Sequence, residues 1–232
     1  MSITKREGFT LIELLIATII FGLMSMSLAA IYSAANGHML QNYRQNAVKS
    51  SALLAMKTIS SRLSEATRID SPAVSGESNV LTFASNVDQL TGCYPVNTDQ
   101  PVAWHKFCYA PGVTATCPYG NCLYYHTGTE KSRGGTCPNG PAWVPPVDPF
   151  CGPSGLGTVI QLASFIQPPA GKFLFSRARP ADGSLGNTLV NIRLRIVWDP
   201  ADATVSGRGK FRSSRAIDTT LDTTVHVIRA GK

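Results

Sequence analysis

The segment Phe9–Ile31, FTLIELLIATIIFGLMSMSLAAI, is a run of 23 residues with a single ionisable side chain, Glu13. Its length matches the roughly 20 helical residues that cross the apolar core of a bilayer. Lys5 and Arg6 precede it, and the usual excess of cations on the cytoplasmic side places the N-terminus in the cytoplasm. The sequence therefore predicts one membrane helix, with the chain after about Ser33 on the far side of the membrane.

Glu13 needs a partner inside this segment. An acid within the bilayer costs about 2.5–3.5 kcal/mol on insertion scales and is by default a functional-site hypothesis. The nearest cation would be a new α-amino group at Phe9, created if the chain were cut after the unhindered Gly8. The alternative is that Glu13 extends to the cytoplasmic interface from near the end of the helix.

An ordinary secretory signal is a second interpretation of the segment. Lys5 and Arg6 would be its charged region, and cleavage would follow small residues at Ala29 or Ala35. Two features oppose this interpretation. The apolar run is longer than the roughly 7–15 residues of such a signal, and it contains a carboxylate.

The residues from Lys5 to Ala17, KREGFTLIELLIA, resemble the cleavage and methylation signature of type IV prepilins and type II secretion pseudopilins. The resemblance implies that a prepilin peptidase in the membrane cuts after Gly8 and methylates the new amino terminus at Phe9. It also implies that Glu13 neutralises the amino terminus of a neighbouring subunit as the apolar helices pack in a filament. Leaving one charge of a buried pair alone costs about 3–5 kcal/mol, so Glu13 would favour one axial register.

A helical pattern continues beyond the apolar run. Apolar residues spaced by three and four would pack on a sheet, with Lys49 and Arg62 on the opposite face. We expect one helix over residues 9–69, ended by Pro72, and the alternative is two helices broken near 36–37. The apolar set is Ala52, Met56, Ile59, Leu63 and Ala66.

After residue 79 the pattern changes to short alternating runs. Leu189 to Trp198 is the clearest, because aliphatic residues alternate with Asn191, Arg193 and Arg195, which predicts a core face and a cationic face. A helix followed by strands predicts an α+β fold with a mostly antiparallel sheet, and the pilin resemblance implies the same fold. The other expected strands lie at 81–83, 158–166, 172–175 and 223–228.

All the cysteines fall between residues 93 and 151, within a region, 91–157, that is rich in proline and glycine. We expect this region to be an inserted loop held by disulfides, because a clustered, even set of cysteines in an exported domain is typical of disulfide bonding. The connectivity stays open. A zinc site that combines Cys117 and Cys122 with His105 and His126 is the alternative. The cysteines are Cys93, Cys108, Cys117, Cys122, Cys137 and Cys151.

The chain has no nucleophile elbow, phosphate-binding loop or paired-histidine motif, so the sequence predicts neither an enzyme nor a cofactor. The formal net charge is +7, and residues 172–232 hold most of the surplus, with eleven cations against five acids. This basic end could contact nucleic acid, as in a DNA-uptake pilus, but such charges usually only solvate a surface. The residues concerned are Arg193, Arg195, Arg208, Lys210, Arg212 and Arg215.

The predicted organisation is a leader at 1–8, a membrane or filament-core helix at 9–32 and an exported head at 33–232. The resemblance implies that the chain is anchored in the inner membrane and then moves to a pilus at the cell surface. The large head favours a minor pilin that primes assembly with other minor pilins and the major pilin. Its length and late strands loosely resemble minor pilins of the PilW type and J-type pseudopilins.

The sequence leaves two other roles open. One is a pseudopilin of a type II secretion system. The other is a tip subunit that binds a surface or DNA through the cysteine-rich region, whose aromatic residues would then be contacts rather than packing between disulfides. These aromatic residues are Trp104, Tyr109, Tyr119, Tyr124, Tyr125 and Trp143.

Overall fold

The computed structural model describes residues 10–118, 120–130, 137–146, 150–178, 187–198 and 217–228. Contacts between residues divide the chain into two compact units, residues 1–46 and 47–232. Several predicted site residues lie outside the described residues. They are Gly8, Phe9, Arg208, Lys210, Arg212 and Arg215.

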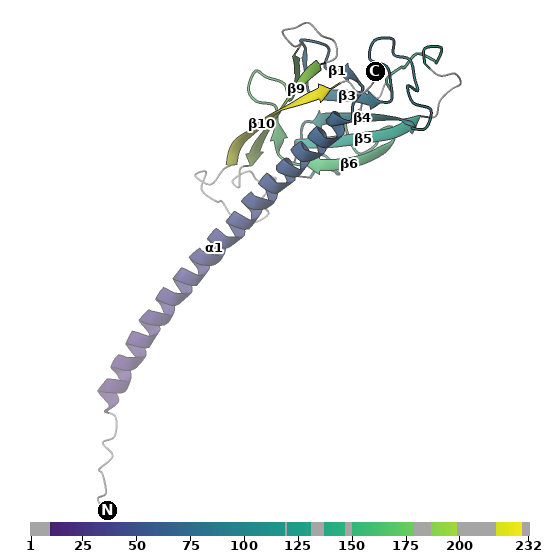
Figure 1. Cartoon of the computed structure of the whole chain (residues 1–232). Helices are drawn as coiled ribbons and strands as arrows, with labels where there is room; N and C mark the ends of the chain where they lie inside the picture. Colours follow the sequence, from purple (N-terminus) through teal and green to yellow (C-terminus); the bar gives the residue numbers. More distant parts are fainter. Residues whose placement is uncertain are drawn as a thin grey trace, which may run out of the picture. The chain divides into compact units, whose positions relative to one another are not determined.

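A single helix, α1, spans Leu11–Ser64 and is the one helix among the described residues (Figure 1). It continues through Asn36 and Gly37, so the break considered for that position does not occur. Glycine lowers helix propensity by about 1 kcal/mol relative to alanine, and the surrounding helix formers outweigh this cost. The expectation of one long helix is confirmed.

The helix ends earlier than predicted, at Ser64 rather than near Ile69. The N–H groups of Glu65 and Ala66 bond to the carbonyls three residues before them, at 3.2 and 3.1 Å, which tightens the final turn. Thr67 then donates its N–H to the Ala84 carbonyl at 3.0 Å. This bond leads the chain into strand β1, Arg68–Ser71, so pairing with a neighbouring strand, and not Pro72, ends the helix.

The strands form two antiparallel sheets rather than one. The first has the order β1-β3-β4-β5-β6 and the second the order β10-β9-β8-β2, with β7 also paired to β9. In the first sheet the further strands are β3 Val80–Ser85, β4 Val102–Ala110, β5 Cys122–Glu130 and β6 Thr158–Ala163. In the second they are β2 Glu77–Ser78, β7 Ile166–Gln167, β8 Phe175–Ala178, β9 Asn187–Trp198 and β10 Ile217–Ile228.

The chain changes sheets within the strand that was predicted at 158–166. β6 ends at Ala163, and β7 begins at Ile166 in the other sheet. Phe165 between them has a φ of 64°, a left-handed conformation that is uncommon for a bulky residue. The strand predicted at 172–175 begins only at Phe175 and runs to Ala178.

One hydrophobic core contains residues from the last turns of α1 and from both sheets. Figure 1 shows this end of the helix beside the strands. The predicted apolar stripe is confirmed, because four of its five residues are buried and Met56 packs against the cluster, with Ala55 as an additional member. In β9 the predicted alternation is also confirmed. Its core-facing residues are at most 3% exposed, namely Val190, Ile192, Leu194, Ile196 and Trp198.

The cysteine-rich region contains more regular structure than predicted. β4 and β5 both lie within 91–157, each is nine residues long, and they occupy adjacent places inside the first sheet. The region is therefore not an insertion outside the sheet, as was expected, because it also supplies two of the sheet's strands. Aromatic and β-branched residues around Trp104 and Tyr124 favour strands, but the prolines and glycines between them dominate the composition.

An aromatic row covers the core-facing side of the first sheet. The Phe107 and Tyr125 rings stack with centroids 4.5 Å apart, and Phe83 lies 5.1 Å from the His105 ring. His105 is only 6% exposed, and its Nδ1 lies 2.8 Å from the Tyr125 hydroxyl. Burial first, and the nearby charge of Arg62 second, lower the pKa of His105 to about 4. The histidine is therefore a neutral member of the core.

The neutral His105 predicts a loss of stability in acid. Because its pKa falls from 6.5 when unfolded to about 4 when folded, the unfolded chain binds the extra proton, and the free energy of unfolding should decrease as the pH falls through this range. His105→Asn, which keeps a polar atom near Nδ1, should flatten this dependence. Chemical unfolding of the full chain in detergent across the range measures it, and identical slopes for both proteins would contradict the assignment.

Candidate functional site

The N-terminal end of α1 forms a capping box. The N–H and the hydroxyl of Thr10 donate to Glu13 Oε2 at 2.9 and 3.0 Å, and the Glu13 N–H lies 3.4 Å from Thr10 Oγ1. Thr10 was not among the predicted site residues. The T-x-x-E spacing is a sequence signal for such a box. It was not recognised because Thr10 and Glu13 lie in the apolar run that was interpreted as a membrane helix.

The cap leaves one oxygen of Glu13 open. Both bonds from Thr10 go to Oε2, and within the described part of the chain no hydrogen bond to Oε1 is found. A carboxylate has about four acceptor positions, so capping and a second, charged partner are compatible. The predicted cleavage and methylation positions, Gly8 and Phe9, lie outside the described residues, and the pairing of Glu13 with an amino terminus stays a prediction.

The first part of α1 exposes apolar side chains on every side. All residues from 11 to 36 are exposed, including Leu11 at 83% and Phe21 at 73%. Among the described residues, α1 is the helix that is long and apolar enough to cross a membrane. An apolar surface of this size is stable only in lipid or against other apolar helices.

Three disulfides pair all six cysteines. They join Cys93 to Cys137, Cys108 to Cys151 and Cys117 to Cys122. The predicted disulfide bonding is confirmed, and this pairing answers the question that the sequence left open. The zinc alternative fails at Cys117 and Cys122, because their sulfurs are bonded to each other and offer no thiolate.

Two of these disulfides hold chain segments against the outer face of the first sheet. Cys108 in β4 points away from α1, and Cys151 joins it there. Next to this bond, Lys106 donates from Nζ to the Phe150 carbonyl at 2.8 Å. Cys93 and Cys137 secure a second segment, in which the Trp143 ring meets the Tyr94 ring edge-on, 5.5 Å between centroids. Both faces of the sheet are thus covered.

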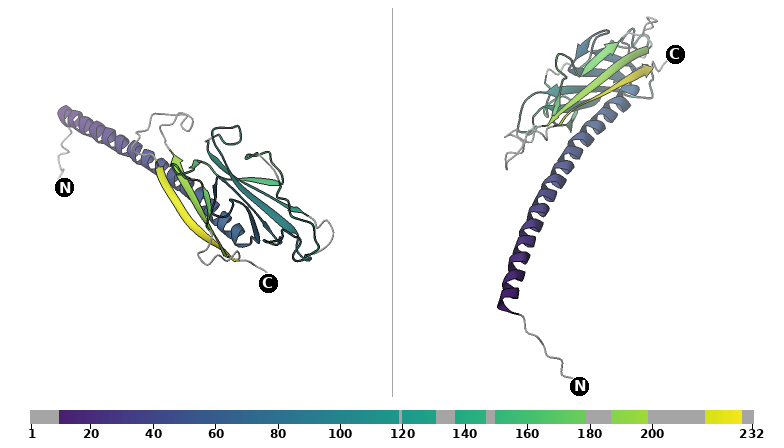
Figure 2. Two further views of the ribbon diagram at one scale, coloured as in Figure 1. Left: turned by 90° about the horizontal axis from the view of Figure 1, so that it is seen from above. Right: turned by 90° about the vertical axis from the view of Figure 1, so that its left-hand side faces the viewer.

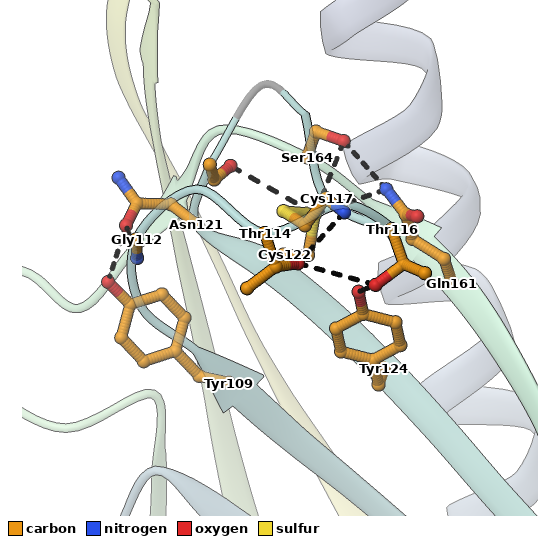
Figure 3. Close-up of a disulfide and its surroundings, with 11 residues drawn as sticks. Tyr109, Gly112, Thr114, Thr116, Cys117, Asn121, Cys122, Tyr124, Gln161 and Ser164 are labelled. Carbon is orange, nitrogen blue, oxygen red and sulfur yellow. Dashed lines mark hydrogen bonds between the residues drawn. A yellow bond between two sulfur atoms is a disulfide. The ribbon is translucent and has the colours of Figure 1, made fainter. Parts of the chain in front are cut away.

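The third disulfide closes a short turn before β5 (Figure 3). Gln161 donates from Nε2 to Cys122 Sγ at 3.1 Å and to Ser164 Oγ at 2.9 Å. On the other side of the turn, the Tyr109 hydroxyl donates to Asn121 Oδ1 at 3.1 Å. Hydrogen bonds therefore tie this turn to β4 and β6 in addition to the sulfur bond.

Most of the aromatic residues that were considered as contacts are buried. Trp104, Tyr124, Tyr125 and Trp143 are between 2% and 8% exposed, and Tyr109 packs against the main core. Tyr119 lies outside the described residues. These side chains pack between strands and disulfides, so they do not form a ready contact surface.

The two described arginines of the predicted basic surface are engaged in ion pairs. Arg195 contacts both oxygens of Asp218, at 2.7 and 2.6 Å. Arg193 lies 3.3 Å from Asp222 and 3.9 Å from Glu77. Phosphates would have to compete with these carboxylates, so the described part of the surface does not favour binding of nucleic acid.

The comparisons with known proteins agree with the N-terminal prediction. The prokaryotic N-terminal methylation motif matches residues 3–29, whereas searches of the curated proteins and of the solved structures find no match. The motif supports a type IV pilin-like protein, and with the exposed apolar helix it indicates membrane anchoring through the N-terminus. It does not separate PilW-type minor pilins from J-type pseudopilins.

The disulfides predict a ranked loss of stability. Cys93 and Cys137 are 44 residues apart and Cys117 and Cys122 only 5. If a disulfide stabilises by limiting the entropy of the unfolded chain, removing Cys93–Cys137 should lower the free energy of unfolding by about 4 kcal/mol and removing Cys117–Cys122 by about 2 kcal/mol. Paired Cys→Ser variants of the full chain, unfolded chemically in detergent, measure both values. A greater loss of stability on removal of Cys117–Cys122 than on removal of Cys93–Cys137 would contradict this ranking.

Proposed function

We propose that this chain is a minor type IV pilin, anchored in the inner membrane by residues 9–32 and then built into a pilus with other minor pilins and the major pilin. Its role is structural, in priming assembly or at the tip. The observation that carries the proposal is Glu13, the one carboxylate of an exposed apolar helix, placed next to the predicted cleavage site with an open oxygen.

The exposed apolar helix supports a role in assembly, because other apolar helices could replace the lipid around it. Lipid covers the side chains from 11 to 31 while the subunit waits in the membrane, and neighbouring helices would replace the lipid in a filament. A carboxylate in that apolar core needs a cation. A prepilin peptidase that cuts after Gly8 would create one at Phe9, and Glu13 of the adjoining subunit could pair with it.

The head supports a minor subunit over a repeating one. Its two sheets carry an added outer layer, which disulfides fix over the first sheet. A head widened in this way packs less easily along a regular filament than at its end. The tip-adhesin alternative has lost its main support, because the aromatic residues proposed as contacts are mostly buried.

Substitutions at Glu13 and Thr10 separate pairing from capping. Glu13→Gln keeps the capping box, where Gln and Glu are both found, but removes the charge. We expect normal cleavage of the leader and at least about a tenfold loss from sheared filaments, since an unpaired buried charge costs about 3–5 kcal/mol. Thr10→Ala removes a cap worth about 1 kcal/mol and should retain most incorporation. Immunoblots of filament and membrane fractions measure both.

The opposite ranking would contradict the proposal. If Glu13→Gln entered filaments normally while Thr10→Ala did not, Glu13 would act only as a helix cap. If the variants left pili unchanged and instead stopped export of proteins, the subunit would belong to a secretion pseudopilus, which shares the same N-terminal chemistry.

A further inference from the structure

Strand β10 forms an unusually long edge of the second sheet. It pairs with β9 along its whole length, from Ile217 opposite Trp198 to Ile228 opposite Asn187, without a register shift. β10 stands at the end of the strand order, and no described strand pairs with its other side (Figure 2). A run of unpaired N–H and C=O groups of this length is a template for another strand.

This edge lacks most of the features that protect edge strands. Such strands are usually short, bulged, or interrupted by proline or lysine. β10 has twelve residues with no proline, glycine, lysine or arginine. Its two acids, Asp218 and Asp222, are paired with the arginines of β9, so they repel an incoming strand less than free carboxylates would.

In the middle of β10 the core-facing side is only half covered, whereas Ile217 and Val227 near its ends are 6% exposed. Leu221 and Val225 pack against the main core but stay partly exposed, whereas their partners across the sheet, Leu194 and Val190, are fully buried. A further strand beside β10 would bury more of the apolar surface of these two side chains, which is now in contact with water. The edge thus offers apolar contact as well as backbone hydrogen bonds.

β9 shows which pattern of side chains suits a strand that pairs with β10. Its aliphatic residues lie in the core beside the apolar row of β10, and Arg193 and Arg195 meet Asp222 and Asp218 on the outer face. Side chains alternate between the two faces of a strand whichever edge is paired. The free edge therefore presents the same apolar row and the same two carboxylates. Asp218 already binds Arg195 with both oxygens, whereas the contact of Asp222 with Arg193 uses Oδ2 and, within the described part of the chain, leaves Oδ1 for a second cation.

We propose that the outer edge of β10 binds an extended segment of another protein in which aliphatic residues alternate with arginine or lysine. The segment would add a strand to the second sheet by β-augmentation. A second copy of β10 fits less well, because this strand carries no lysine or arginine to face Asp218 and Asp222. The inference does not depend on whether the subunit works in a pilus or in a secretion fibre.

A labelled peptide with the sequence of β9, NTLVNIRLRIVW, is a suitable probe of this edge. It should bind the full chain in detergent, as measured by fluorescence polarisation. Thr223→Lys places a charge in the half-covered core-facing row and should weaken binding by about tenfold or more. Thr224→Glu, at an exposed neighbouring position of the outer face, is the control, because it adds a charge of the sign that this face already carries, and it should bind at least as well as the wild type.

Controls on charge and folding complete the test. A peptide with glutamate in place of both arginines should bind at least about tenfold more weakly, and both protein variants should keep the unfolding midpoint of the wild type. No binding, or equal binding to both peptides or both variants, would overturn the proposal. Sedimentation that shows a dimer of the full chain, lost on Thr223→Lys, would assign the edge to a second copy instead.

Discussion

Glu13 is held by its own helix through Thr10 and still has an open oxygen, within an exposed segment that has no other charge. The need of this carboxylate for a cation is the constraint on which the role of the helix depends. A carboxylate in an apolar environment is tolerated only with a partner, and the apolar side chains around it require lipid or other helices. Cleavage after Gly8 would supply the partner, and assembly would supply the helices.

The same helix also organises the head. Its last four turns bury Ala52, Ala55, Ile59 and Leu63 in a core shared with both sheets, so the sequence that anchors the chain is continuous with the sequence that nucleates the fold. Disulfides then fix an outer layer over the first sheet. In the second sheet, no described strand pairs with the outer edge of β10.

The fold could be predicted where periodicity is strong. The membrane run, the apolar stripe of α1 and the alternation in β9 follow from side-chain direction in helices and strands. Long-range pairing could not be predicted. Thr67 bonds to Ala84 and ends the helix early, the turn at Phe165 moves the chain between sheets, and two core strands lie among prolines and glycines. Each of these depends on a contact distant in sequence.

The candidate site was predicted in part for similar reasons. Glu13 and the cysteines stand out by residue type, because an acid in an apolar run and an even cysteine cluster are rare patterns. The cap from Thr10 was missed, and the pairing of Arg193 and Arg195 with acids of β10 was not foreseen, since it depends on strand register. Burial of Trp104 and Trp143 likewise depends on which segments the disulfides bring over the sheet.

Mass spectrometry of the mature N-terminus decides whether the chain is processed as a prepilin. If the chain is a prepilin, the mature protein isolated from membranes begins at Phe9 and carries one methyl group on its amino terminus. A mature chain that begins at Ala30 or Asn36 would instead show cleavage of a secretory signal. That result would remove Glu13 from the mature protein and contradict the whole account of its assembly.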